Sequence, residues 1–196
     1  MKFFTIKRKE YEIPQFFFCK YISYWTIFNT LSDMKILVLS DTHGYIDERI
    51  LHYAKLADQV WHAGDIGDID VINKISEVSK LKIVYGNIDS SKLRIGLKKI
   101  IFFKVEKFNV FITHIYNKRL FDEMRSNNNL KSNFSNILVC GHSHILKIKF
   151  YNNTDTLLIN PGAIGKKGFH KKRTMVSFEI KNDNITNMNI IDFGFR

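Results

Sequence analysis

The sequence predicts an α/β fold, a four-layer α/β/β/α sandwich of two mixed sheets. Three observations lead to this expectation: a length of 196 residues that suits one main domain, an alternation of strand and helix patterns over residues 35–85, and a second half rich in strands. The alternation implies parallel strands joined by right-handed crossovers. The additional strands require a second sheet, with the helices on the outer faces.

Each expected element rests on its pattern of apolar residues. Residues 35–40 form an apolar run that ends in polar residues, which is typical of a buried strand. The helix that follows takes its apolar positions from Ile50, Leu51 and Ala54. In chain order we expect strand 35–40, helix 47–57, strand 59–62, helix 69–79, strand 81–85, strand 97–105, strand 108–114, helix 117–126, and strands 136–140, 144–151, 156–159, 174–180 and 185–191.

The first 33 residues differ from the rest of the chain. They contain ten aromatic residues and neither Gly nor Ala, whereas Met34 directly precedes the first expected strand. We therefore expect residues 34–196 to form the functional domain. Residues 1–33 are either an upstream in-frame reading before a true start at Met34 or a poorly ordered extension, and mass spectrometry of the native N-terminus separates these two cases.

Composition excludes several classes of protein. The apolar stretch 16–31 is interrupted by Lys20 and Ser23 and is shorter than the roughly 18–20 residues of a spanning helix, and the lack of Ala and Gly in residues 1–33 leaves no A-x-A-like signal-peptide cleavage site. Two cysteines, Cys19 and Cys140, exclude a disulfide framework and a four-thiolate metal site. We expect a cytoplasmic protein with no membrane partner.

Side chains that bind metals follow five of the expected strands, at the point where each strand ends. In α/β sheets, ligands bind outside the carboxyl ends of the strands. Taken singly, each motif also fits a turn or a packed histidine, and only their order along the chain favours a shared site. The candidate metal ligands at this edge are Asp41, His43, Asp65, Asn87, His114, His142 and His144.

These seven ligands suit a pair of divalent cations. Two carboxylates, one amide oxygen and four imidazoles are enough for two ions when one carboxylate bridges them. Oxygen and nitrogen donors without thiolate favour Mn, Fe, Zn or Co over soft metals or calcium. Two cations about 3.5–4 Å apart clamp the attacking and leaving oxygens of a displacement at phosphorus. The sequence therefore predicts metal-dependent hydrolysis of a phosphate ester.

The order of motifs resembles the calcineurin-like metallophosphoesterases, and most of all their small YfcE-type phosphodiesterase branch, to which the retromer subunit Vps29 is also similar. The resemblance covers residues 34–191. It implies one ion held by Asp41, His43, Asp65 and His144, and a second held by Asp65, Asn87, His114 and His142, with Asp65 as the bridge. The motifs that carry it are Asp41-x-His43, Gly64-Asp65, Gly86-Asn87, Thr113-His114, Gly141-His142-Ser143-His144 and Asn160-Pro161-Gly162-Ala163.

The resemblance also implies an activity. It indicates hydrolysis of phosphate esters, phosphodiesters above all, by a hydroxide that bridges the two ions, while Asn87 and His114 orient the phosphate. Mn²⁺ is the expected metal, with Fe, Zn, Co, Ni and Mg left open. Ile88 stands where larger family members have a histidine, and residues 115–119 lack the usual glycines. These departures leave open an alternative, a non-catalytic scaffold that binds proteins as Vps29 does.

The formal charge of +11 raises the question of an anionic partner. The densest basic run, 165–173, is either a solvated face or a loop over the metal edge, where His170 or Arg173 contacts a phosphate oxygen. No helix-turn-helix, zinc-finger or RNA-recognition signature accompanies the charge. We therefore expect a small phosphodiester or another phosphate ester as substrate and no stable nucleic-acid complex, and a homo-oligomer stays open.

Three polar residues near the ligand turns have structural roles in our interpretation. His62 ends the second expected strand, and we expect it to support the turn by hydrogen bonds rather than to bind metal. Asp68 and Asp89 are expected to cap a helix or to close a turn.

Overall fold

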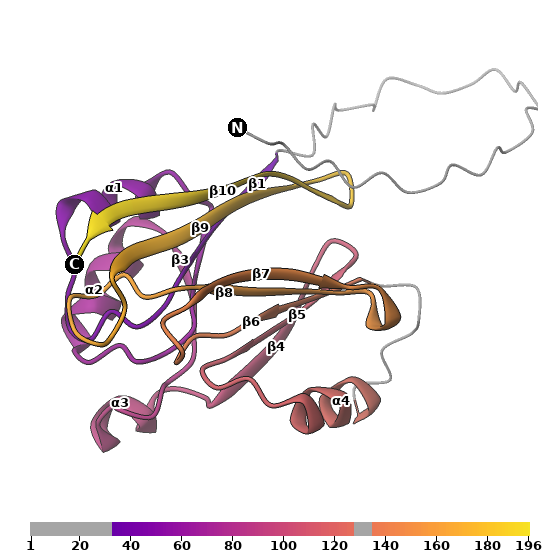
Figure 1. The fold of residues 1–196 in the computed structure, drawn as a ribbon, viewed down its shortest axis with the longest axis horizontal. Helices are drawn as coiled ribbons and strands as arrows, with labels where there is room; N and C mark the ends of the chain where they lie inside the picture. The colour runs from indigo at the N-terminus through magenta and orange to yellow at the C-terminus, as the bar shows by residue number, and fades with distance from the viewer. Residues whose placement is uncertain (1–32, 128–134) are drawn as a thin grey trace, which may run out of the picture.

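Two five-stranded sheets pack face to face in the computed structural model, which describes residues 33–127 and 135–196 (Figure 1). Helices lie on the outer faces of both sheets, so the expected four-layer α/β/β/α arrangement is confirmed. The predicted extension 1–33 lies outside the described residues except for Asp33, and its status stays a prediction. None of the described helices is long and apolar enough to cross a membrane.

The first sheet has the order β10-β9-β1-β2-β3. Its central strand β1 pairs in parallel with β2 and antiparallel with β9, so the sheet is mixed as expected. Side chains of β1 alternate between the two faces: Ile36 and Val38 point to the other sheet, whereas Leu37 and Leu39 pack under the helices. The strands are β1 (Met34–Leu39), β2 (Gln59–His62), β3 (Lys80–Ile83), β9 (Lys172–Lys181) and β10 (Asn184–Phe195).

Two amphipathic helices cover the outer face of this sheet. Helix α1 (Glu48–Lys55) begins at Asp47, whose side chain accepts the Ile50 N–H, and α2 (Ile69–Val78) begins at Asp68, whose side chain accepts the Asp70 N–H. The capping role expected for Asp68 is thus confirmed. Both helices turn apolar side chains inward onto Leu37, Leu39 and Val60: Ile50, Ala54, Val71 and Ile75.

The second sheet has the order β4-β5-β6-β8-β7. Strands β5, β6 and β8 are parallel, and the two edge strands run antiparallel to their neighbours. Helix α4 (Lys118–Asn127) covers the outer face, where the Phe121 ring packs edge-on against Phe111 at 5.1 Å between centroids. The strands are β4 (Ile100–Val105), β5 (Phe108–Thr113), β6 (Ser135–Val139), β7 (Leu146–Tyr151) and β8 (Thr156–Pro161).

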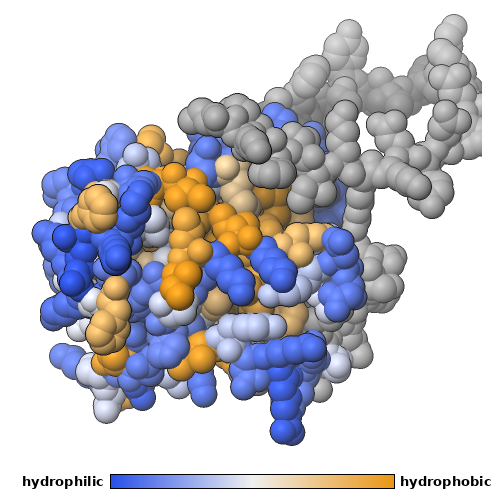
Figure 2. All heavy atoms as spheres, in the orientation of Figure 1, coloured by the Kyte–Doolittle hydropathy of each residue, from blue (hydrophilic) through white to orange (hydrophobic). Residues whose placement is uncertain are grey.

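The largest core lies between the two sheets. Trp61 is fully buried there and packs edge-on against Phe103 and Phe178. Burial of such rings dominates core energetics because each covers a large apolar area. On the face shown in Figure 2, apolar side chains also reach the surface in the middle, framed by hydrophilic ones. The core therefore fixes the two sheets against each other and holds their strand ends at a common edge.

The structure differs from the expected elements in a few places. Helix α3 (Ser91–Ile95) and the 3₁₀ turn η1 (Asn152–Thr154) were not anticipated, because elements this short show no periodicity. The Ser90 hydroxyl caps α3 by accepting the Leu93 N–H. Strand β4 begins at Ile100 instead of residue 97, and Lys98 forms an isolated bridge with Val84.

Candidate metal centre

The turns that follow the strands are joined to one another by backbone hydrogen bonds. Asp41 N–H donates to Gly64 C=O and His43 N–H donates to Asp65 C=O, both at 3.0 Å, so the turns after β1 and β2 lie side by side. Gly141 N–H donates to His114 C=O at 2.9 Å and joins the turns after β5 and β6. All of these turns lie at one edge, as the sequence predicts.

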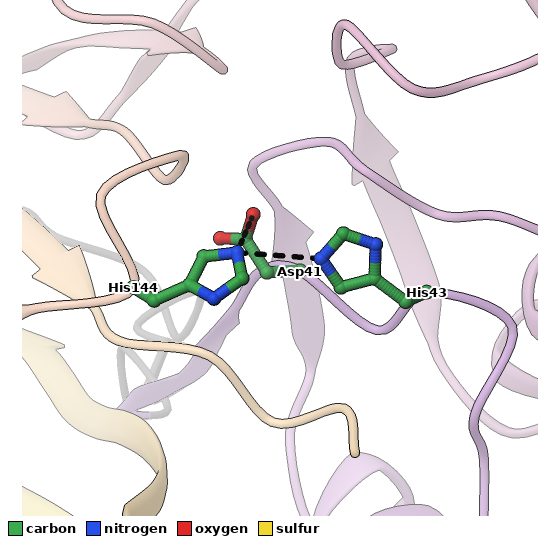
Figure 3. A group of neighbouring side chains, drawn as sticks. All are labelled: Asp41, His43 and His144. Atoms are coloured by element: carbon green, nitrogen blue, oxygen red, sulfur yellow. Dashed lines mark hydrogen bonds and ion pairs between the residues drawn. The ribbon is translucent and has the colours of Figure 1, made fainter. Parts of the chain in front are cut away.

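A first cluster consists of Asp41, His43 and His144, whose potential ligand atoms lie within 4.8 Å of one another (Figure 3). His144 Nε2 is 3.1 Å from Asp41 Oδ1 and 3.3 Å from His43 Nε2. The Asp41 side chain is completely buried, whereas both histidines are partly exposed. We call these three residues the inner cluster.

A second cluster consists of Asp65, His114 and His142, again with ligand atoms within 4.8 Å. His114 Nε2 is 3.2 Å from Asp65 Oδ1 and 3.0 Å from Asn87 Oδ1, so the amide oxygen faces the same point. Asp65 and His114 are buried, whereas Asn87 and His142 are exposed to solvent. We call these four residues the outer cluster.

The structure thus brings all seven predicted ligands to one edge, in two groups. The His142 N–H donates to Asp41 Oδ2 at 3.2 Å and connects the groups directly. Asp65 belongs to the outer cluster by its side-chain oxygens. Its expected contact with an ion of the inner cluster stays a prediction.

Five of the seven ligands have a left-handed backbone. Their φ values are 56° at Asp41, 49° at His43, 55° at Asp65, 68° at His142 and 55° at His144. Residues other than glycine adopt this region rarely, at a cost of order 1–3 kcal/mol each, and such residues cluster at functional sites. The turns after β1, β2 and β6 therefore store strain that redirects ligand side chains toward a common point.

Two ligand atoms are placed in a way that a bound cation would explain. Asp41 Oδ1 is buried, yet no described residue donates a hydrogen bond to it. His114 Nδ1 lies 2.8 Å from the Ala63 carbonyl oxygen, which only accepts, so Nδ1 carries a proton and Nε2 is the ring nitrogen that faces the Asp65 and Asn87 oxygens. When the ring is neutral, this Nε2 has the lone pair that a cation can take. Converging lone pairs on oxygen and nitrogen fit divalent cations.

Comparison with known proteins agrees with this geometry. Residues 34–183 match the calcineurin-like phosphoesterase superfamily domain. The chain belongs to this superfamily. It is 27% identical over 146 residues to the probable metallophosphoesterase MJ0623 of Methanocaldococcus jannaschii, in an alignment that covers 70% of this chain and 72% of that protein. The family resemblance stated from the motifs is confirmed.

Solved structures of low identity share the fold of this phosphoesterase chain. A structure described as a novel archaeal phosphodiesterase superposes with a TM-score of 0.66 at 19% identity, covering 82% of this chain and 100% of the other. Vps29 of Entamoeba histolytica complexed with Zn²⁺ gives 0.57 at 15% identity, with coverage of 82% and 100%. The phosphoesterase YfcE of E. coli gives 0.52 at 23% identity, with coverage of 80% and 98%.

Glycine is required at two positions beside the carboxylates of the two clusters. A Cβ atom at Gly86 would overlap the Asp65 carboxylate and its backbone nitrogen, and a Cβ atom at Gly141 would overlap Ser40 Oγ and lie 2.8 Å from Asp41 Oδ2. The backbone passes so close to both carboxylates that no larger residue fits without displacing them. The Gly-Asn and Gly-His motifs thus have a steric cause.

Two residues that we expected to be structural hold the ligand turns together. His62 Nδ1 accepts the Gly64 N–H at 3.1 Å and its Nε2 lies 2.9 Å from the Thr42 hydroxyl, which confirms the hydrogen-bonding role. The Asp89 carboxylate accepts the N–H groups of Gly67 and Gly86 at 2.8 and 2.7 Å. Asp89 therefore joins the Asp65 turn to the Asn87 turn.

Asn160 is a supporting residue that belongs to a sequence motif but whose role the motif does not reveal. Its side-chain amide donates to Gly141 C=O at 2.8 Å and to Ser143 Oγ at 3.1 Å, and its Oδ1 accepts the Gly162 N–H. It fixes the loop that carries His142 and His144. A buried asparagine at the end of an apolar strand is the signal that identifies it.

Burial and hydrogen bonding shift the acid–base properties of the centre. Complete burial lowers the pKa of His62 to about 4, so this ring is neutral at pH 7. Burial also lowers the pKa of His43. Burial opposes the charged form of His114, but the Asp65 carboxylate outweighs it and the pKa of His114 is raised. Burial opposes the charged form of Asp65 as well, but a hydrogen bond donated by Nε2 of the protonated His114 ring outweighs it and lowers the pKa of Asp65.

The loop between β8 and β9 and the start of β9 carry the two residues expected to contact substrate, His170 and Arg173, and only His170 contacts a metal-ligand candidate. His170 is 9% exposed, and its Nδ1 lies 3.2 Å from His144 Nδ1, so it contacts a ligand of the inner cluster. Arg173 is buried, donates through Nε to Ile164 C=O at 2.7 Å and lies 4.6 Å from the centre of the Tyr45 ring. A phosphate contact by Arg173 stays a prediction, which this buried placement does not favour.

Proposed function

We propose that this chain hydrolyses phosphate esters, phosphodiesters in particular, with two divalent metal ions. The observation that carries the proposal is the pair of ligand clusters at one edge, which the hydrogen bond from His142 to Asp41 joins and in which the buried Asp41 Oδ1 has no hydrogen-bond donor among the described residues. The inner cluster would hold one ion and the outer cluster the other, with Asp65 shared. When bound, two divalent ions activate a water and stabilise the charge on the phosphoryl oxygens.

The residues of the chain supply binding and orientation. Asn87 is exposed and its backbone carbonyl accepts a hydrogen bond from Arg94 Nη2 at 2.6 Å, which holds the amide at the mouth of the outer cluster. His114 lies behind it, fixed by the Ala63 carbonyl. These positions support the proposal that both side chains orient a phosphate. Ile88 supplies no proton, so esters with good leaving groups are the favoured substrates.

The finer parts of the proposal rest on chemistry and on relatives. A structural neighbour described as an archaeal phosphodiesterase supports the choice of diesters. Oxygen and nitrogen donors without thiolate support Mn²⁺, with Fe, Zn, Co, Ni or Mg as other candidates. We further propose a cytoplasmic enzyme whose partner is a small phosphate ester rather than a nucleic-acid complex, with the functional unit in residues 34–196.

A screen of divalent metals against aryl phosphomonoesters and aryl phosphodiesters tests the proposal. The wild-type chain should hydrolyse diesters faster, and Asp65→Ala should lose turnover and bound metal together. Asp70→Ala is the matched control, because Asp70 is an exposed carboxylate that pairs with Lys74 on α2. Hydrolysis by Asp65→Ala at the wild-type rate would contradict the assignment.

One observation favours the alternative of a protein-binding scaffold. Large apolar side chains next to the ligands are exposed: Ile88 at 48%, Ile115 at 44%, Ile145 at 67% and Phe169 fully. Apolar groups around a polar centre are typical of an interaction surface. The fold is shared with Vps29 of Entamoeba histolytica, the structural neighbour already described at a TM-score of 0.57 and 15% identity. Absence of hydrolysis with every metal in the screen would favour this alternative.

A further inference from the structure

The loop between β8 and β9 is attached to the inner cluster along its length. Ile164 N–H donates to Ser40 C=O at 3.1 Å, and Gly165 N–H donates to Asp41 C=O at 3.0 Å, so the loop begins by pairing with the residues that follow β1. Further along, Gly168 lies against the His144 ring, where a Cβ atom would overlap it. The loop therefore forms a wall behind His144.

The hydrogen-bond partners of His170 and His144 determine which ring nitrogen of each carries the proton. His170 Nε2 lies 3.0 Å from the Gly165 carbonyl oxygen, which only accepts, so Nε2 carries the proton of the neutral ring and Nδ1 has a lone pair. His144 Nδ1 lies 3.2 Å from that lone pair. It must then carry a proton, and His144 Nε2 is left with a lone pair.

The geometry of the two rings agrees with this assignment. Their centroids are 5.1 Å apart and the rings are nearly perpendicular, at 73°. The other side of the His144 ring presents Nε2 to Asp41 Oδ1 and His43 Nε2, as Figure 3 shows. The lone pair of His144 thus points into the inner cluster, at the place where a cation would bind.

We propose that His170 is a positioning residue that fixes the tautomer and orientation of His144 for metal binding. The hydrogen-bonded series runs from Gly165 C=O through His170 to His144 and ends at the inner cluster. A residue that hydrogen-bonds to the second ring nitrogen of a metal-binding histidine sets the tautomer of that ring, and its loss typically weakens metal affinity roughly 10–100-fold. The inference rests on the proposed metal centre and replaces a substrate contact by His170.

Nitrogen-15 NMR of the metal-free full chain at pH 8 tests the tautomer without any mutation. His144 should carry its proton on Nδ1, and His170 should carry its proton on Nε2. A His144 ring protonated on Nε2 in the folded wild-type protein would overturn the inference. This measurement involves no hydrolysis, so a chain that proves inactive on every ester would defeat the proposed function and leave the tautomer result standing.

Metal titration of variants tests the consequence. His170→Leu should weaken binding of one of two Mn²⁺ ions roughly 10–100-fold and leave the other unchanged. His170→Asn places an acceptor oxygen near the position of Nδ1 and should restore most of that affinity. His52→Leu, at an exposed histidine of α1, is the control. Wild-type affinities in His170→Leu would overturn the inference. An equal loss at both sites would also contradict it, because it would show a merely structural role.

Discussion

The inner and outer clusters share one edge of the sandwich but differ in their surroundings. The inner cluster has a wall formed by the β8–β9 loop, and its carboxylate Asp41 is completely buried. The outer cluster presents Asn87 and His142 to solvent. Pre-organised ligands lose less conformational freedom on binding. We therefore expect the inner ion to bind more tightly, while the outer position exchanges readily and meets the substrate.

The largest expected effect is that of Gly86→Ala on the outer cluster. A side chain at this position would displace the Asp65 carboxylate, and a shift of about 1 Å can cost roughly 100-fold in rate. We expect at least that loss of turnover, with the outer ion lost first in a metal analysis. Gly96→Ala is the control, since nothing lies within 4 Å of its Cβ position. Equal turnover in both variants would contradict this interpretation of the Gly-Asn motif.

Removing one imidazole from each cluster compares the two directly. His144→Ala should weaken the tighter binding event and His142→Ala the weaker one, and each variant should keep the other event. Each affinity should fall by at least roughly 100-fold, because loss of a residue that only supports a ligand can already cost that much. Calorimetric titration of metal-free protein with Mn²⁺ resolves the two events. If both variants lost the same event, the division into two clusters would be wrong.

The pH dependence of stability tests His62, which connects the turns after β1 and β2 through Thr42 and Gly64. The pKa of His62 falls from 6.5 to about 4 on folding, so the unfolded chain binds one more proton between these values. Stability of the metal-free protein should therefore decrease as pH falls from about 6.5 to 4, by up to roughly 3 kcal/mol from this group. Urea unfolding across this range measures it.

Two variants isolate the contribution of His62 from that of other groups. His62→Asn removes the titrating ring and should flatten this part of the pH profile. His52→Asn, at an exposed position, should leave the profile unchanged. An identical slope in wild type and His62→Asn would mean that another group causes the dependence.

The smallest effect is expected from the lysines of the β8–β9 loop. Lys167 and Lys171 are exposed, so Ala at both positions removes charge without disturbing the core. We expect KM for an aryl phosphodiester to rise about two- to fivefold at low salt and the difference to disappear at high salt, because solvent screens such charges. A salt-independent effect would point to direct contact instead.

The sequence predicts the ligands well because their signal is local. Each ligand comes at or shortly after the end of an apolar run, and parallel strands bring such ends together whatever the details of packing. Asp41, Asp65 and His114 are therefore identifiable from the amino-acid pattern alone. The same logic predicts the sandwich, although α3 is too short to produce a recognisable pattern.

What the sequence does not predict depends on long-range contacts. The proximity of His170 to His144 follows from pairing of the β8–β9 loop with residues after β1, which lie more than a hundred positions away. In the sequence, His170 appears only as a histidine in a basic run, and the burial of Arg173 against Tyr45 is equally invisible. The left-handed backbone of the ligands arises from the tight turns, and their side-chain types do not require it.

The central place of β1 has a consequence for how the protein is made. β1 carries the residues that lead into Asp41 and His43, yet one of its two neighbours is β9, which the ribosome produces after all seven ligands. Until β9 is synthesised, β1 has an unpaired edge and the loop behind His144 is not yet held at its β9 end. Metal loading should therefore follow translation of β9, and a nascent chain stalled before residue 172 should not hold the inner ion although it already contains every ligand.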